Sequence, residues 1–320
     1  MDAISPIPLS AIEAARARIG GAAVRTPLLR LDRRGAGEVW LKLESLQPIG
    51  SFKIRGAANA MALAPDADLA RGVYTASAGN MAQGVAFAAR RLGLTCRVIV
   101  PDSAPRTKLR AVERLGGVVV AIPFADWWNV IQKHGHPDES GFFIHPVSDP
   151  AVIAGNGTVG LEIIEDLEFF DSVVVPYGGG GLSCGVASAM KAKRPGVPVY
   201  AAEVDTAAPF AASLAANRAS SVERIPTFVD GIGGSSVLEE MWPLARDLLR
   251  GSLVVSIESV CDAIRTLADH AHIISEGAGG AAVAAAMRRA DETDEVVVAI
   301  VSGGNIDLDT LTVILDGRQP

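Results

Sequence analysis

Aromatic residues are scarce in this 320-residue chain, at 5%, and it has only three cysteines, Cys96, Cys184 and Cys261. None of them forms a C-x-x-C pair, which argues against a zinc site and against a disulfide framework. An excess of basic charge is also missing. The net charge is −7 and the isoelectric point is near 5.3, so we expect no nucleic-acid partner.

Long hydrophobic runs are missing as well. The most apolar stretch, residues 277–287, is too short to cross a bilayer. The first twenty residues show no basic segment followed by an apolar run, so they do not look like a signal peptide. We therefore expect a cytoplasmic protein without a membrane partner.

Short β-branched runs recur along the chain and indicate strands buried on both faces. Between them lie helix-like segments at 82–93 and 105–117, which end in glycine. Alternating strands and helices predict an α/β protein with mostly parallel sheets. We expect the strands at 96–100, 117–122, 172–176, 198–204 and 295–301. The polar stretch 133–146 reads as a loop at the border of a subdomain. It carries three histidines, read as solvated or packed rather than as metal ligands: His134, His136 and His145.

Lys53 lies between Phe52 and Ile54 in "GSFKIRGA" (50–57). A lone lysine is most often a solvated surface charge whose stem covers apolar neighbours. A lysine confined in a pocket can instead lose its charge and react with carbonyl compounds, including pyridoxal phosphate. The residue alone leaves both readings open.

Four consecutive glycines, Gly178 to Gly181, follow the predicted strand 172–176 and precede a helix-like run. Backbone amides at the start of a helix form an anion site, which favours phosphate binding over a simple turn. The spacing matches neither a nucleotide P-loop nor a dinucleotide fingerprint. Residues 75–84 also place small polar residues between a strand and a helix, where their amides could hold a carboxylate; the alternative is a helix start capped by Ser77 or Asn80. Residues 301–307 end the last strand and could form a simple turn.

Together these motifs resemble the threonine/serine dehydratase and serine racemase family, and the resemblance runs from about Arg25 to Asp307. It rests on "SFKIRGA" (51–57), "SAGNMAQGVAFAA" (77–89), "VIAGNGTVGLEI" (152–163), "PYGGGGLSCGVA" (176–187) and "VSGGN" (301–305). The family consists of pyridoxal-phosphate enzymes of fold type II, the tryptophan synthase β-like fold. The resemblance implies two three-layer α/β/α domains: a large cofactor-binding domain of residues 1–72 plus 149–320, and a small domain of residues 73–148. It also implies a homodimer.

The resemblance implies a role for each matching position. Lys53 would bind the cofactor covalently and act as the catalytic base, with Phe52 packed near the cofactor ring. Asn80 would contact the phenolic oxygen of the cofactor, and Ser302 would face its pyridine nitrogen. The phosphate would be held by Gly178, Gly179, Gly180, Gly181 and Leu182. The substrate would meet Ser77, Ala78, Gly79, Asn80 and Met81.

The expected activity is that of a pyridoxal-phosphate-dependent ammonia-lyase. It would convert an L-β-hydroxy amino acid of the threonine or serine type into a 2-oxo acid and ammonia. The alternatives are an amino-acid racemase, a dehydratase for 3-hydroxyaspartate or phenylserine, and a non-catalytic protein that only binds the cofactor. In racemases of this group a serine serves the second face of the substrate, and this chain has Ala78 there.

The chain departs from the family pattern near the substrate. Met81 stands where the family has histidine, and "EGAGG" keeps Glu276 but lacks the family's proline and hydroxyl. The positions that bind a cation in many relatives read Glu203, Ala207 and Pro209, so we expect no metal. We interpret Trp127 and Trp128 as packing residues; that they line a pocket is the less favoured interpretation.

Overall fold

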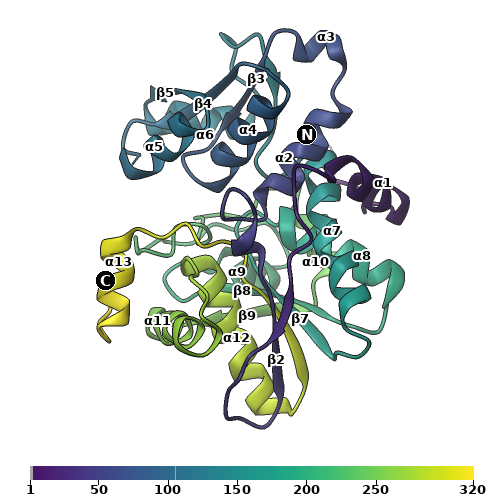
Figure 1. The fold of residues 1–320 in the computed structure, drawn as a ribbon, viewed down its shortest axis with the longest axis vertical. Helices are drawn as coiled ribbons and strands as arrows, with labels where there is room; N and C mark the ends of the chain where they lie inside the picture. Colours follow the sequence, from purple (N-terminus) through teal and green to yellow (C-terminus); the bar gives the residue numbers. More distant parts are fainter. Residues whose placement is uncertain (1–2, 105) are drawn as a thin grey trace.

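The computed structural model describes residues 3–104 and 106–320, which form two sheets with helices on both faces of each (Figure 1). The larger sheet has the strand order β1-β2-β10-β7-β8-β9, and only the β1–β2 pair is antiparallel. Its strands are β1 (Leu28–Arg30), β2 (Glu38–Lys42), β10 (Val296–Ile300), β7 (Ser172–Pro176), β8 (Val199–Val204) and β9 (Gly251–Val255).

The smaller sheet is parallel throughout, with the order β5-β4-β3-β6. Its strands are β5 (Gly117–Ile122), β4 (Cys96–Pro101), β3 (Val73–Ala76) and β6 (Phe142–Phe143). In Figure 1 this sheet lies at the top with α4 (Asn80–Arg91), α5 (Arg106–Arg114) and α6 (Phe124–Gln132). All four strands fall within the predicted small domain, whose limits at 73 and 148 stay a prediction.

The remaining helices surround the larger sheet or join the two sheets. They are α1 (Leu9–Ile19), α2 (Lys53–Leu63), α3 (Asp66–Leu69), α7 (Pro150–Asp166), α8 (Gly181–Lys193), α9 (Pro209–Ala216), α10 (Trp242–Leu248), α11 (Ile257–Thr266), α12 (Gly277–Thr293) and α13 (Leu308–Leu315). A 3₁₀ turn, η1 (Glu44–Leu46), precedes α2, and a π-helical turn, η2 (Leu267–Ala271), follows α11.

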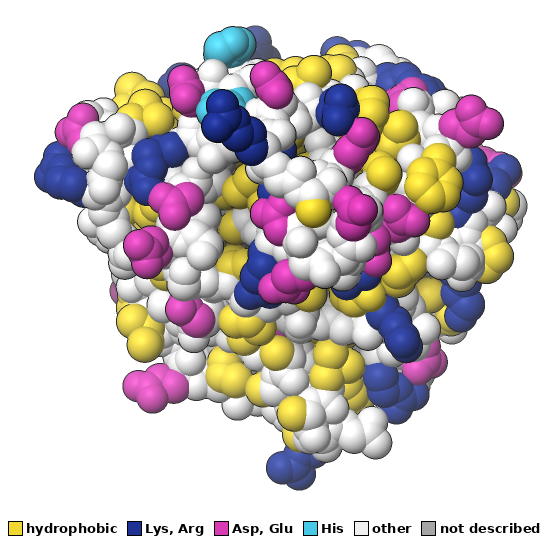
Figure 2. Space-filling view, turned by 90° about the horizontal axis from the view of Figure 1, so that it is seen from below, with side chains coloured by type: hydrophobic (Ala, Val, Ile, Leu, Met, Phe, Trp, Pro, Cys, Tyr) yellow, Lys and Arg dark blue, Asp and Glu magenta, His cyan; other side chains and the backbone are white. Residues whose placement is uncertain are grey.

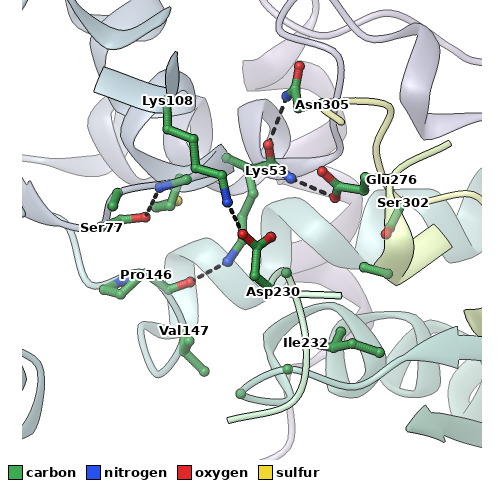
Figure 3. Close-up of a pocket in the computed structure, with 18 of the residues that line it drawn as sticks. Lys53, Ser77, Lys108, Pro146, Val147, Asp230, Ile232, Glu276, Ser302 and Asn305 are labelled. Atoms are coloured by element: carbon green, nitrogen blue, oxygen red, sulfur yellow. Dashed lines mark hydrogen bonds and ion pairs between the residues drawn. The ribbon is translucent and has the colours of Figure 1, made fainter. Parts of the chain in front are cut away.

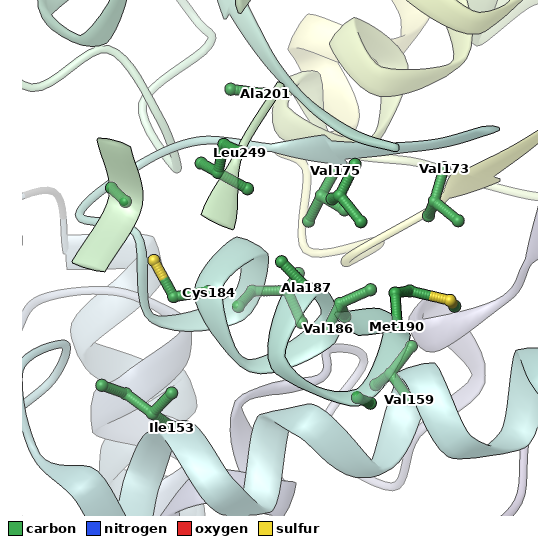
Figure 4. Close-up of a cluster of buried hydrophobic side chains, with 14 of the residues drawn as sticks. Ile153, Val159, Val173, Val175, Cys184, Val186, Ala187, Met190, Ala201 and Leu249 are labelled. Atoms are coloured by element: carbon green, nitrogen blue, oxygen red, sulfur yellow. The ribbon is translucent and has the colours of Figure 1, made fainter. Parts of the chain in front are cut away.

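The strand β7 shows why its sequence is continuously apolar. Val173 and Val175 pack into the cluster formed with α7 and α8, whereas Val174 faces the cluster formed with α11 and α12. Figure 4 shows the first cluster, in which Val173 and Val175 lie opposite Val186 and Met190 of α8. A strand that is covered on both faces is predominantly apolar, and the one polar residue of β7, Ser172 at its start, donates to Glu295 at 2.8 Å. The predicted parallel sheet is confirmed.

All five predicted strands are present, with ends shifted by no more than one residue. The predicted loop 133–146 is wrong at one point, because it contains β6, which pairs with β3. Two residues are too short to give a periodic signal. The helix predicted at 105–117 is present as α5, and its expected first residue, Pro105, lies outside the described residues.

No helix within the described ranges is long and apolar enough to cross a membrane. The face seen in Figure 2 carries basic and acidic side chains interspersed among apolar ones, with no field of a single sign.

Candidate active site

A cavity of about 480 Å³ lies between the two sheets. Segments that follow the carboxyl ends of β3, β4, β7 and β10 line it, which is where open parallel sheets bind ligands. Every site residue predicted from the sequence borders this one cavity: Phe52, Lys53, Ser77, Ala78, Gly79, Asn80, Met81, Gly178, Gly179, Gly180, Gly181, Leu182 and Ser302. The structure thus brings together segments that are up to 250 residues apart in the chain (302 minus 52).

Lys53 is the first residue of α2, and its ammonium group points into the cavity (Figure 3). Its Nζ donates a hydrogen bond of 2.7 Å to the carbonyl oxygen of Pro146 and lies 5.3 Å from the centre of the Phe52 ring. Burial lowers the pKa of Lys53 to about 8, although the nearby Glu276 carboxylate acts to raise it. A lysine in this state supplies a neutral amine close to neutral pH.

The start of α2 is held by a buried ion-pair network. The guanidinium of Arg55, two residues after Lys53, contacts Glu44 at 2.7 Å and Glu162 at 2.6 Å. Lys42 of β2 completes the network through a 2.7 Å contact with Glu162. Because α2 is tied in this way to η1 and α7, its first turn holds Lys53 in the cavity.

The glycine segment joins β7 to α8, and α8 begins at Gly181 with Gly180 as its N-cap. Gly180 has a φ of +97°, a conformation that side chains rarely adopt. A Cβ at Gly179 would lie 2.6 Å from the methyl groups of Val147, and one at Gly178 would lie 3.1 Å from the carbonyl oxygen of Gly231. Only glycines allow the backbone amides to be exposed here at the positive end of the α8 dipole, which suits a phosphate group.

Residues 77–81 form a second set of amides, at the start of α4. The Gly79 amide donates to Ser77 Oγ at 3.2 Å, and no side chain caps the helix. A Cβ at Gly79 would meet no atom within 4 Å, so this backbone borders open space. Met81 is buried and contributes an apolar wall where an acid or base would need a polar atom.

Ser302 follows β10 and is 2% exposed. Its carbonyl oxygen accepts a 3.0 Å hydrogen bond from the amide of Phe52, which joins the lysine segment to the end of the sheet. Ser302 also lines the cavity. A confined lysine, a set of exposed amides and a hydroxyl group around one cavity fit the aldehyde, phosphate and ring nitrogen of pyridoxal phosphate.

Sequence reasoning did not foresee three features of the cavity. The carbonyl of Pro146 contacts Lys53, Lys108 of α5 forms an ion pair with Asp230, and Asn305 donates to Asn80 Oδ1 at 2.7 Å. Asn80 in turn donates to Glu276 Oε1 at 2.7 Å (Figure 3). Asn305 was within reach of sequence reasoning, since it closes the "VSGGN" motif. The other two depend on backbone atoms or on residues more than a hundred positions apart.

The remaining candidates divide between the cavity and the packing. Trp127 lines the cavity, so the less favoured interpretation, a pocket wall, is correct for Trp127; Trp128 does not line the cavity.

His145 is buried, and its ring stacks on the ring of His134 with 4.1 Å between the ring centres, in agreement with the interpretation of these histidines as packing residues. His145 Nδ1 accepts from the amide of Ser148 at 2.7 Å, and Nε2 donates to the carbonyl of Ile131 at 3.1 Å. With both ring nitrogens engaged, this histidine has no free atom for a metal.

The residues around Glu203 do not fit the cation site that the resemblance suggested at Glu203, Ala207 and Pro209. The two carboxylate oxygens of Glu203 accept hydrogen bonds of 2.8 Å from the amides of Phe210 and Ala211 and one of 2.6 Å from Ser252 Oγ. Pro209 begins α9 at the position where a second carboxylate would be needed. Glu203 therefore caps α9, and we derive no step that uses a metal.

Comparisons with known proteins find relatives over most of the chain. L-threonine ammonia-lyase of Thermotoga maritima is 39% identical over 88% of this chain and 70% of its own length. The catabolic L-threonine dehydratase of Escherichia coli is 35% identical over 97% of this chain and 96% of its own. The structure of maize serine racemase superposes with a TM-score of 0.88 at 31% identity, covering 98% of both chains. The fold is therefore that of the fold type II enzymes. Residues 19–303 match the profile described as "Pyridoxal-phosphate dependent enzyme", and the chain belongs to this family of enzymes, whose cofactor is pyridoxal phosphate.

Proposed function

We propose that this enzyme is an ammonia-lyase that converts L-threonine, L-serine or a related L-β-hydroxy amino acid into a 2-oxo acid and ammonia. The observation that carries the proposal is the partly buried Lys53, with a pKa near 8, in one cavity with the amides at the start of α8. The names of the relatives from Thermotoga maritima and Escherichia coli support the same reaction.

Each group around the cavity has a task in this reaction. Bound pyridoxal phosphate supplies a carbonyl group for the amino group of the substrate and a ring that accepts electrons from the α-carbon. Neutral Lys53 takes the α-proton at Nζ. The amides of Ala78 and Asn80 bind the substrate carboxylate, since those of Ser77 and Gly79 already donate to the carbonyl of Ile99 and to Ser77 Oγ. The amides of Gly178 to Leu182 bind the phosphate. Ser302 offers a hydroxyl rather than a carboxylate to the ring nitrogen, which favours elimination over transamination.

Racemisation is the second candidate, because structures of serine racemases from maize and Dictyostelium discoideum superpose on this chain with TM-scores of 0.88 and 0.86. Inverting the α-carbon requires a proton donor on each face of the substrate. Lys53 can serve one face. On the other face Ala78 has no proton to give, and neither does Met81, so we favour elimination.

The test is a reaction on L-serine and L-threonine, followed by assays of ammonia and 2-oxo acid and by chiral chromatography. We expect 2-oxo acid from both substrates, little D-isomer, and no turnover by a Lys53→Ala variant that keeps its fold. D-serine accumulating faster than pyruvate would overturn the elimination reading in favour of the racemase. Full activity of the Lys53→Ala variant would overturn the assignment of the base.

We also propose that the enzyme acts as a homodimer in the cytoplasm, where free amino acids and the cofactor are available. The resemblance to the dehydratase family supports the dimer. Analytical ultracentrifugation measures it directly, and a sedimentation coefficient of a single 33.2 kDa chain would contradict it.

A further inference from the structure

Three side chains at the rim of the cavity form a continuous chain of hydrogen bonds that begins at a backbone carbonyl. Figure 3 shows Asn305 and Glu276, the two outer side chains of this chain. Asn305 Nδ2 donates to the carbonyl oxygen of Ile49 at 2.9 Å and to Asn80 Oδ1 at 2.7 Å. Asn80 Nδ2 then donates to Glu276 Oε1 at 2.7 Å. Asn80 begins α4 beside the smaller sheet, while Asn305 and Glu276 belong to segments of the larger one.

The orientation of each amide in this chain follows from its neighbour. A carbonyl oxygen can only accept, so the nitrogen of Asn305 must face Ile49. Both hydrogens of that nitrogen are then used, one on Ile49 and one on Asn80. Asn80 must therefore turn its oxygen toward Asn305 and its nitrogen toward Glu276. Rotating the Asn80 amide by 180° would place its nitrogen against the Asn305 nitrogen and would break both bonds.

The backbone next to Lys53 makes room for this arrangement. Gly50 has a φ of +71°, and a Cβ at this position would lie 2.7 Å from Asn305 Oδ1. The Gly304 amide also donates to the carbonyl oxygen of Gly50 at 2.8 Å. Asn305 is thus packed against the loop that leads into Lys53, which fixes the starting point of the chain relative to the catalytic lysine.

One donor remains unused. Of the two hydrogens on Asn80 Nδ2, one is bound to Glu276, and the other is the donor that the Asn80 side chain still has to offer to the cavity. We propose that Asn305 and Glu276 are positioning residues, which hold the Asn80 amide so that its remaining N–H donates a hydrogen bond to an oxygen of the bound cofactor. The inference rests on the cofactor site of the proposed function, but it does not depend on which amino acid is the substrate.

The two positioning residues can be separated by substitution. Glu276→Gln removes the charge but keeps an oxygen that accepts from Asn80, so the Asn80 orientation is retained. Asn305→Asp removes both donors and places an oxygen opposite Asn80 Oδ1, which favours the rotated amide. The double variant Asn305→Asp/Glu276→Gln satisfies the rotated amide at both ends. The glutamine introduced at position 276 can donate to Asn80 Oδ1, and the aspartate introduced at position 305 can accept from Asn80 Nδ2. In the double variant Asn80 therefore presents its oxygen to the cavity.

The experiment adds pyridoxal phosphate back to cofactor-free protein and measures its dissociation constant by absorbance, together with the thermal unfolding midpoint of each variant. We expect Glu276→Gln to bind within about twofold of the unsubstituted protein and Asn305→Asp to bind about tenfold more weakly, since a donor to a charged oxygen is lost. In the double variant the unfolding midpoint should rise above that of Asn305→Asp, while the cofactor affinity should stay low.

Because the unfolding midpoint should recover in the double variant while the cofactor affinity should not, the two measurements distinguish a role in orienting Asn80 from a purely structural role. If the double variant recovers cofactor affinity together with stability, or if Asn305→Asp binds as tightly as the unsubstituted protein, the inference is wrong. Should Asn305→Asp fail to fold, Asn305→Ala decides, because it removes the donor without adding a charge. It should weaken cofactor binding about threefold, and unchanged affinity would again refute the inference. Failure of the unsubstituted enzyme to release ammonia would refute the proposed function but leave these affinities interpretable.

Discussion

Replacing Lys53 by methionine should stabilise the cofactor-free protein while destroying its activity. Burial lowers the pKa of Lys53 from 10.5 to about 8. At 1.36 kcal/mol per pKa unit, holding the ammonium form in this cavity costs about 3 kcal/mol. Methionine has a similar length and no charge, so it removes this cost. The lost hydrogen bond to Pro146 offsets about 1 kcal/mol, which leaves a net gain of about 2 kcal/mol at pH 7.

The stability advantage of the Lys53→Met variant should decrease as the pH rises. Between pH 8 and 10.5 the unfolded chain binds more protons at Lys53 than the folded protein, so the unsubstituted protein gains stability as the pH rises. The advantage of the Lys53→Met variant should therefore be full below pH 8 and shrink toward zero by about pH 9.5.

Urea unfolding of both cofactor-free proteins from pH 6.5 to 9.5 measures this difference. Lys191→Met, at an exposed position on α8, is the matched control and should show no such trend. A difference that is constant with pH, or a variant that is less stable at pH 7, would refute the reasoning, because Lys53 would then titrate like a surface lysine.

Three further predictions concern the cofactor and the metal. EDTA should leave ammonia release unchanged, because the Glu203 carboxylate is already satisfied by α9 and Ser252; inhibition reversed by magnesium or calcium would contradict this. Gly179→Ala should weaken cofactor binding about a hundredfold in a titration, since its Cβ would collide with Val147 and displace the amides, whereas Gly196→Ala, with open space around it, should bind normally. Ser302→Asp should keep the cofactor but release ammonia more slowly, because a carboxylate stabilises a protonated ring nitrogen; an unchanged rate would show that Ser302 is not its partner.

The sequence alone located five strands of the two sheets and the main segments that surround the cavity. Strands such as β7 could be located because a parallel strand that is covered on both faces is predominantly apolar, and this is visible in the run from Val173 to Pro176. The four glycines could be interpreted because few functions other than close approach to an anion explain them between a strand and a helix. Both signals are local, so one chain carries them without knowledge of its neighbours. The strands β1, β2, β6 and β9 were not predicted, and the two-residue β6 forms only by pairing with β3.

Only the tertiary structure showed which atoms meet inside the cavity. The carbonyl of Pro146 that holds Lys53 is a backbone atom, and no residue type marks it in the sequence. Asn80 meets Asn305 and Glu276 across separations of 225 and 196 residues, and it does so because the two sheets bring their loops to one rim. The lowered pKa of Lys53 has the same origin, since desolvation depends on everything packed around the ammonium group and not on the residues beside it in the chain.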